Sequence, residues 1–138
     1  MRGPIRSRPV DEIRAEAERL AQAGFTELVL TGIHLTSYGR DFAPRQTLLD
    51  AIRAVQDVPG VRRIRLGSLE PTSATVEFAQ TLRTMDKVCP QFHLALQSGS
   101  DTVLQRMARR YNMRMYRQAM ENLRAVYPMA AFTTDVLT

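Results

Sequence analysis

The sequence predicts an α/β protein with parallel strands, either a piece of a (β/α) barrel or an open sheet with fewer strands. Short apolar runs rich in β-forming residues alternate with segments in which apolar residues recur at helical spacing. A closed eight-stranded barrel needs about 250 residues, whereas this chain has 138. The alternation opens with a helix and gives four to five strands, which we expect to lie parallel and in chain order.

The length and composition are those of one globular domain. Of the 138 residues, 44% are hydrophobic and 24% are charged, and no apolar run approaches the roughly 20 residues that cross a membrane. No secretory signal opens the chain. The single cysteine, Cys89, excludes an internal disulfide and fits a reducing compartment. We therefore expect a cytoplasmic protein that makes no contact with a membrane.

The chain is basic, with a formal net charge of +5 and a pI near 10.1. Eighteen of its nineteen basic residues are Arg, whose planar guanidinium suits phosphate contacts and base stacking. This composition allows a polyanionic partner such as RNA. The same bias can reflect genomic composition alone, so the charge by itself leaves RNA binding open.

The first helix–strand unit follows an irregular basic segment at residues 1–8. Pro9 begins a helix, where its missing N–H does no harm, and Gly24 ends it in the left-handed conformation. The helix carries one apolar stripe, made of Val10, Ile13, Ala17, Leu20 and Ala21. Residues 27–31 form a short strand, and a polar loop flanked by Gly follows at residues 32–39.

The second unit runs from Thr47, which can cap a helix, to a strand at residues 61–67. This strand leads into the sequence SLEP at residues 68–71. Pro71 restricts Glu70 to an extended conformation, which fixes the direction of its carboxylate. That carboxylate can bind an ammonium group or a ribose hydroxyl, or it can cap a helix that starts one or two residues after Pro71.

The third unit consists of a helix at residues 76–83 and a buried strand at residues 92–96. Cys89 lies in the loop before this strand, next to Pro90. A lone cysteine is a poor cluster ligand, because iron–sulfur clusters need several thiolates close together. We therefore expect Cys89 to be structural.

The polar turn QSGSD, at residues 97–101, ends this strand. Ser100 is placed as the N-cap of a helix that extends to Tyr111. Asn112 can cap the next helix, and residues 131–138 give the last strand. Loops at the carboxyl ends of parallel strands bind ligands, so this turn is the first candidate site. The alternative is that it is only a well-capped connection.

Four motifs carry a family resemblance. They are RGPIRSR at residues 2–8, TGIHLTSYG at 31–39, SLEP at 68–71, and QSGSD with RMARRY within 97–111. In this order they resemble the radical SAM methylthiotransferases, and together they span nearly all of the chain. The second motif is most similar to the branch that acts on threonylcarbamoyladenosine 37 of tRNA. The resemblance implies an incomplete, parallel-stranded partial (β/α) barrel of the radical SAM type.

The resemblance also implies that the chain is the central part of a domain that binds S-adenosyl-L-methionine. The acidic residue that such enzymes commonly carry after this strand is absent, so His34 or the backbone of Gly32 would take its place. The residues that we expect at the cofactor are Gly32, His34, Glu70, Gln97, Ser98 and Ser100. The alternative for His34 is a structural or solvent-facing histidine.

A tRNA partner follows from the same resemblance. We expect Arg109, Arg110 and Tyr111 to contact the RNA, by charge pairing with its backbone and by stacking on a base. The alternative for the two arginines is a solvated helix end whose charge suits the helix dipole.

The resemblance places the first strand, with its CxxxCxxC loop, before Met1 and the last strand after Thr138. The intact parent would hold two 4Fe–4S clusters, generate a 5′-deoxyadenosyl radical from S-adenosylmethionine and insert a methylthio group at C2 of the adenosine. One cysteine holds neither cluster. We therefore expect no metal ligand, no catalytic residue and no turnover in the isolated chain, and self-association through exposed sheet edges.

Other functions stay open at this point. The sulfur acceptor could be isopentenyladenosine of tRNA or an aspartate of a ribosomal protein, because the acceptor is chosen largely outside this segment. The chain could instead be a cluster-free α/β module that binds a nucleotide or a protein, which would explain the single cysteine. An aldolase-like barrel enzyme is disfavoured, because Lys87 lies before a strand rather than at a strand's carboxyl end.

Overall fold

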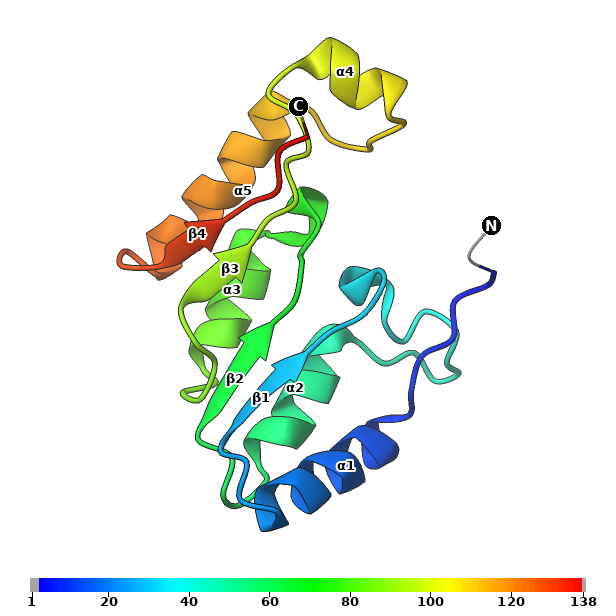
Figure 1. The fold of residues 1–138 in the computed structure, drawn as a ribbon, viewed down its shortest axis with the longest axis vertical. Helices are drawn as coiled ribbons and strands as arrows, with labels where there is room; N and C mark the ends of the chain where they lie inside the picture. Colours follow the sequence, from blue (N-terminus) through cyan, green and yellow to red (C-terminus); the bar gives the residue numbers. More distant parts are fainter. Residues whose placement is uncertain (1–2, 138) are drawn as a thin grey trace.

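The computed structural model describes residues 3–137, in which helices and strands alternate along the chain (Figure 1). In chain order the elements are α1 Val10–Gln22, β1 Glu27–Leu30, η1 Leu35–Ser37, α2 Leu48–Gln56, β2 Arg63–Leu66, η2 Pro71–Ser73, α3 Val76–Arg83, β3 Gln91–His93, α4 Asp101–Arg106, α5 Met113–Val126 and β4 Ala131–Thr133, where η marks a 3₁₀ turn. Across this range no helix combines the length and the apolar character that crossing a membrane requires. Met1, Arg2 and Thr138, which belong to the predicted first and last segments, lie outside the described residues.

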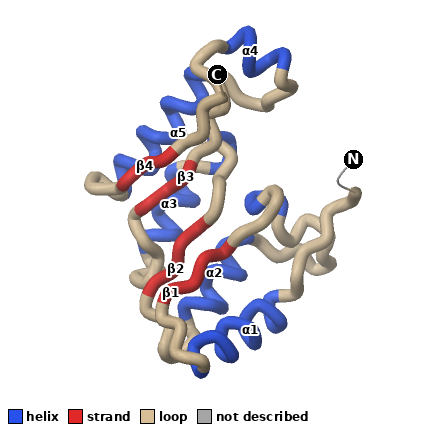
Figure 2. Tube along the Cα trace, in the orientation of Figure 1, coloured by secondary structure: helices blue, strands red, loops and turns tan. Residues whose placement is uncertain are grey.

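The strands of the described residues are parallel and follow one another in chain order (Figure 2). β1 pairs with β2, and β3 pairs with β4. Single parallel bridges extend this pairing, between Ile64 and Val88, Leu69 and Leu94, and Gln97 and Val136. The first two of these bridges connect the β2 region to the β3 region. This is the predicted α/β class, and within residues 3–137 the sheet does not close into a barrel.

One face of the strands packs against the helices. Leu28, Ile64 and Phe92 lie on this face and are buried in the main core. α1 packs on α2, and α3 packs on α5, and Figure 1 shows α2 and α3 behind the strands. Burial of each large apolar side chain contributes about 1.5–3 kcal/mol. The apolar stripes predicted from the sequence therefore supply the contacts that hold the helices on this face.

The opposite face is mostly polar and only partly covered, although Val29, which is 55% exposed, also lies on it. We call it the polar face and define it by Glu27, Arg63, Arg65, His93 and Thr133, which alternate along the strands with more buried residues. The Nε atoms of Arg63 and Arg65 lie 3.3 Å and 3.1 Å from the two carboxylate oxygens of Glu27. Polar side chains of neighbouring strands thus pair with one another across this face.

The predicted helix ends agree with the structure where they depend on residues close together in the sequence. Thr47 Oγ1 accepts a hydrogen bond from Asp50 N, and Asp50 Oδ2 accepts one from Thr47 N at 2.8 Å, which completes a capping box. Asn112 Oδ1 accepts from Met115 N at 2.9 Å. Gly24 has a φ of 92°, the expected left-handed end of α1.

The helix after the QSGSD turn is shorter than predicted. Ser100 is its N-cap residue, as expected, but the serine side chain makes no capping hydrogen bond. α4 ends at Arg106 rather than near Tyr111. The reason is Ala108, whose φ of 54° is left-handed and turns the chain out of the helix.

The residues after Glu70 also differ from the prediction. Pro71–Ser73 is a 3₁₀ turn, and the α-helix begins only after Thr75, which provides the N-cap hydroxyl. A helix start directly after Pro71 was therefore wrong, because the backbone needs this extra turn to reach the cap. Glu70 itself is extended, with φ −74° and ψ 136°, as the following proline predicts.

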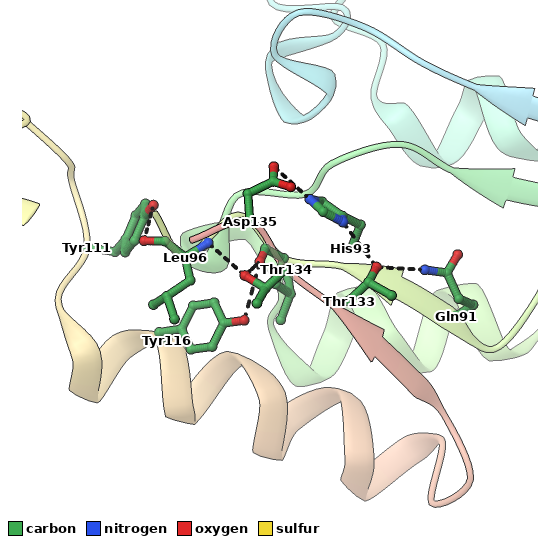
Figure 3. A network of polar contacts seen from close by, with 9 residues as sticks. Gln91, His93, Leu96, Tyr111, Tyr116, Thr133, Thr134 and Asp135 are labelled. Carbon is green, nitrogen blue, oxygen red and sulfur yellow. Dashed lines mark hydrogen bonds and ion pairs between the residues drawn. The ribbon is translucent and has the colours of Figure 1, made fainter. Parts of the chain in front are cut away.

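The last strand is shorter than predicted because a side chain interrupts its pairing. Beyond β4 the hydroxyl of Thr134 accepts a hydrogen bond from Leu96 N at 3.1 Å and donates one to Leu94 O at 2.7 Å (Figure 3). The hydroxyl thus replaces a backbone partner at this point. Backbone pairing resumes at the Gln97–Val136 bridge.

Candidate functional site

The loops that leave the four strands at their carboxyl ends meet at one edge of the sheet, because the strands are parallel. Residues 31–34 follow β1, residues 67–70 follow β2, residues 94–98 follow β3 and residues 134–137 follow β4. This edge is where α/β proteins bind their ligands. All the predicted cofactor residues except Ser100 lie in these loops.

His34 and Glu70, which were predicted separately, contact each other. His34 Nε2 lies 3.1 Å from Glu70 Oε1, and the buried hydroxyl of Ser37 lies 2.6 Å from His34 Nδ1. A hydroxyl that donates to Nδ1 leaves the ring proton on Nε2, where it faces the carboxylate. The Glu70 side chain remains 31% exposed. The pair therefore presents an oriented carboxylate that can accept from an ammonium group or a hydroxyl.

A groove of about 1590 Å³ extends from this edge along β1, α1 and α2. Its walls are the N-terminal segment, α1, β1 with its following loop, and the residues after α4. The predicted site residues that line it are Gly32, His34, Glu70, Arg109 and Arg110. Most ligand pockets measure about 300–1,000 Å³. The groove is therefore large enough for a ligand of the size of a nucleoside.

The N-terminal segment forms a fixed wall of this groove. Ser7 N donates to Asp41 Oδ2 at 2.7 Å, and Gly39 N donates to Ser7 Oγ at 2.8 Å. The Tyr38 hydroxyl donates to Arg8 O at 2.7 Å. The hydrogen bonds from Ser7 lower the pKa of Asp41 below its usual value. The basic segment is thus attached to the loop after β1 rather than free in solvent.

Gly32 and Gly39, which follow β1, differ in whether the fold requires a glycine at their position. Gly39 has a φ of 77°, and a Cβ there would lie 2.1 Å from Gln46 O, so the fold requires glycine. A Cβ on Gly32 would lie 3.7 Å from Leu35 Cδ1, which is an ordinary contact. The fold therefore does not require glycine at position 32.

Gln97 adopts a left-handed backbone with a φ of 69°. Its N–H donates to Asp135 O at 2.8 Å, and its carbonyl accepts from Leu137 N at 2.9 Å, which holds this conformation. A non-glycine residue in this region costs about 1–3 kcal/mol, and such residues cluster at functional sites. Of the neighbouring serines, Ser98 Oγ accepts from Ser100 N at 3.2 Å. These three residues form the next loop along the edge and do not line the groove.

The predicted RNA residues divide into two kinds. Arg109 and Arg110 are exposed on the groove side. Tyr111 is only 5% exposed, and its hydroxyl donates to Leu96 O at 3.2 Å. Burial raises the pKa of Tyr111, with Arg109 opposing and Glu70 adding to this effect. The ring of Tyr111 is therefore part of the fold, which corrects the expectation that it offers a stacking surface for RNA.

The sequence reasoning missed a second histidine–carboxylate pair. His93 Nε2 lies 3.2 Å from Asp135 Oδ2, and His93 Nδ1 lies 3.0 Å from the hydroxyl of Thr133 (Figure 3). One available signal was that His93 lies between two buried strand residues, Phe92 and Leu94, and so points to the opposite face. Nothing in the sequence gave its partners, which lie 40 and 42 residues away.

Cys89 does not fit an iron–sulfur cluster. It is the only cysteine of the chain, it is 7% exposed, and its Sγ lies 3.4 Å from Arg63 Nε. Within residues 3–137 there is no group of three or more His, Cys, Asp or Glu side chains placed to hold a metal ion. Clusters of the 4Fe–4S type are held by several thiolates. The residues present here therefore hold no such cluster by themselves.

The chain is similar to known proteins over its whole length. Residues 1–137 match the family model of the radical SAM superfamily. Threonylcarbamoyladenosine tRNA methylthiotransferase MtaB of Bacillus subtilis is 40% identical over 99% of this chain, and the protein of that name from Thermotoga maritima is 32% identical over 96%. A tRNA-2-methylthio-N(6)-dimethylallyladenosine synthase of Dictyoglomus thermophilum is 37% identical over 99%. The chain spans 30–31% of the length of these relatives.

Proposed function

The chain belongs to the radical SAM superfamily, and we propose that residues 1–138 form the central part of a radical SAM domain in a longer tRNA methylthiotransferase. The groove at the carboxyl ends of the strands carries this proposal. Its lining includes an oriented carboxylate, Glu70, and two exposed arginines, Arg109 and Arg110. These groups support a groove in which a charged nucleoside cofactor and a polyanion would bind side by side.

We propose that the reaction adds a methylthio group to C2 of N6-threonylcarbamoyladenosine 37 in tRNA. The support for this acceptor is the 40% identity to a relative named for it. Relatives named for the dimethylallyl-modified nucleoside are 32–37% identical, so isopentenyladenosine is the second candidate acceptor. S-adenosylmethionine, when bound, would supply the methyl group and the radical chemistry. The two iron–sulfur clusters of such an enzyme would be held by residues outside this chain, because Cys89 does not fit them.

The residues of the chain would bind and orient the cofactor. Glu70 would accept from the cofactor's ammonium group, because it is a carboxylate at a strand's carboxyl end with part of its surface open. His34 would act through Glu70 by fixing its position. The backbone of Gly32 would lie against the cofactor, because glycine has no side chain to hold a ligand away from it. The loop of Gln97, Ser98 and Ser100 would offer further polar groups.

The arginines after α4 would bind the RNA backbone. Residues 101–124 contain six arginines and two acidic residues, and 6 − 2 gives +4 of the chain's net charge of +5. This segment is therefore one of the basic parts of the chain, beside residues 1–8, which hold three arginines and no acidic residue. Within residues 3–137 neither Arg109 nor Arg110 forms an ion pair. Both guanidinium groups are thus free for phosphate contacts.

Turnover by the intact protein that contains this chain tests the proposed reaction. The protein, with its clusters reconstituted, is given S-adenosylmethionine and tRNA that carries threonylcarbamoyladenosine, dimethylallyladenosine or unmodified adenosine at position 37. We expect mass spectrometry of the nucleosides to show methylthiolation of the first. Methylthiolation of the second alone would transfer the proposal to the other acceptor, and no product from any tRNA would contradict the function.

The Glu70→Gln variant tests the cofactor role. We expect its affinity for S-adenosylmethionine to fall about tenfold or more, the size of one lost charge-assisted hydrogen bond. Glu121→Gln on the exposed side of α5 is the matched control and should bind as the wild type does. Calorimetric titration of the intact protein measures both.

A further inference from the structure

The first two turns of α5 carry two exposed arginines, Arg114 and Arg117. They lie three positions apart, so they are neighbours on one face of the helix. They belong to residues 102–120, which contain five arginines and no lysine, aspartate or glutamate. The residues that line the groove end along the chain at Arg110. Arg114 and Arg117 therefore form a basic surface outside the groove, which we call the α5 basic surface.

These two arginines lack the acidic partners that arginines of other helices have. Each arginine of α1 and α2 forms an ion pair with a carboxylate three or four positions away. Within residues 3–137 neither Arg114 nor Arg117 forms an ion pair, not even with Glu121, which lies one turn after Arg117. Asp101, the nearest acidic residue before them in the chain, uses its Oδ1 to accept from Met113 N at 2.7 Å. Both guanidinium groups are therefore left for a partner outside these residues.

Stability of the helix does not explain the two charges. The first turn of α5 contains no acidic residue, and Arg114 places a cation near the positive end of the helix dipole. Arg114 and Arg117 also repel each other, because like charges one turn apart are destabilising. Arg124, in the last turn, is different: its guanidinium carbon lies 5.3 Å from the centre of the Phe132 ring, and its charge suits the negative end of the dipole. An anionic partner would relieve the repulsion at the start of α5.

The α5 basic surface lies at the same end of the molecule as the candidate site. Figure 1 shows that α5 runs antiparallel to β4, so the first turns of α5 lie at the end of the sheet where the strands finish. Arg110, which lines the groove, is four positions before Arg114. Arg124 lies about 10 Å beyond Arg117 along the helix axis, toward the other end of the sheet. A polyanion that leaves the groove past Arg110 can therefore continue over Arg114 and Arg117.

We propose that Arg114 and Arg117 bind phosphates of the base-paired stem that adjoins the tRNA loop carrying nucleotide 37. This inference rests on the proposed function, which brings that nucleoside to the groove. Double-stranded RNA is bound mostly through its shape, its phosphates and its 2′-hydroxyl groups, and the planar guanidinium of arginine suits phosphate. Phosphate contacts carry no sequence information. The α5 basic surface therefore adds affinity for the stem without choosing the acceptor nucleoside.

Two RNAs separate contacts to the stem from contacts to the loop. The intact protein is titrated, over a range of salt concentrations, with the stem-loop RNA that contains nucleotide 37 and with the loop sequence alone as a single strand. For the stem-loop, Arg114→Ala with Arg117→Ala should reduce the slope of log affinity against log salt by roughly 1.4–1.8, the value for two phosphate contacts. For the single strand, we expect the same variant to bind as the wild type does.

Two further pairs of variants serve as controls. Arg62→Ala with Arg124→Ala removes the same charge from exposed positions at the other end of the sheet, and should leave the slope unchanged. Arg114→Lys with Arg117→Lys keeps both cations and should retain most of the affinity for the stem-loop, because lysine binds phosphate as a point charge. Thermal unfolding without RNA shows whether each variant is folded. The alanine variant at positions 114 and 117 should be at least as stable as the wild type, because it removes a repulsion.

Each outcome has a defined meaning. An unchanged slope for the stem-loop overturns the inference, and so does an equal loss in the Arg62 and Arg124 control, which would show that only net charge matters. An equal loss with both RNAs also overturns it, because it would assign the arginines to the loop. A lower unfolding temperature with an unchanged slope would show that they pair with acidic groups elsewhere in the longer protein. Failure of the wild type to bind either RNA would count against the proposed function instead.

Discussion

The two histidines of the chain have the same type of surroundings although they lie in different loops. The ring of His34 lies between the Ser37 hydroxyl and Glu70, and the ring of His93 lies between Thr133 and Asp135. In each case Nδ1 meets a hydroxyl and Nε2 meets a carboxylate. The sequence predicted His34 and Glu70 as separate site residues, because each follows a strand. Their contact, over 36 positions of the chain, required the parallel pairing of β1 and β2.

Gln97 gives a prediction about backbone strain. Gln97→Gly removes the side chain and the strain of the left-handed backbone, whereas Gln97→Ala removes only the side chain. We expect the glycine variant to have a free energy of unfolding about 1 kcal/mol higher than that of the alanine variant. Chemical denaturation measures the difference. Equal stabilities would show that the turn is not strained at this residue.

Among the elements, α4 ends earlier than the sequence predicted, at Arg106 rather than near Tyr111. Residues 106–111 contain helix-forming residues such as Ala108, so local propensity extends the helix. The structure ends it because the chain turns at Ala108, and Asp101 Oδ1 accepts from Met113 N at 2.7 Å. This bond holds the starts of α4 and α5 together. It joins residues 12 positions apart, which is beyond the range of a capping signal.

The capping box of α2 gives a prediction at the scale of one helix. Thr47→Ala removes the hydroxyl that accepts from Asp50 N and donates to Asp50 Oδ2 at 2.7 Å. We expect the free energy of unfolding to fall by about 1 kcal/mol. Thr102→Ala, at an exposed position of α4, serves as the control and should change stability little. An equal loss in both variants would argue against a capping role.

On the scale of the whole molecule, the arginines differ in whether they form ion pairs. Arg14 pairs with Glu18, and Arg19 pairs with Glu16. Within residues 3–137, Arg109 and Arg110 form no ion pair. The two groups therefore offer a comparison between paired and unpaired guanidinium groups.

This division gives a matched test of RNA binding. In the intact protein, Arg109→Ala with Arg110→Ala should weaken tRNA binding and reduce the slope of log affinity against log salt by roughly 1.4–1.8, the value for two phosphate contacts. Arg14→Ala with Arg19→Ala changes the net charge equally but removes arginines that are already paired. Filter binding over a range of salt concentrations compares them. If both pairs reduce the slope alike, only overall charge matters.

The number of cysteines gives a prediction about metal content. The isolated 138-residue chain, reconstituted with iron and sulfide, should show no stable cluster absorbance, because one buried thiol holds no 4Fe–4S cluster. The intact protein, reconstituted in the same way, is the positive control. A stable cluster in the isolated chain would require ligands other than cysteine and would contradict this account.

Features that depend on neighbouring residues could be predicted from the sequence alone. Helical stripes, the caps at Thr47 and Asn112, the left-handed Gly24 and the extended Glu70 involve interactions within about four positions, so composition and spacing specify them. The parallel α/β class followed from the order of these elements.

Contacts between side chains far apart in the sequence became visible only in the folded chain. The burial of Tyr111, the contact of His34 with Glu70 and the chain of hydrogen bonds to Asp135 depend on strand register and on how the loops lie at the edge of the sheet. A shift of one residue in register would turn each strand side chain to the other face. The partners of a site are therefore fixed by long-range packing, whereas the residue types that can form it are visible in the sequence.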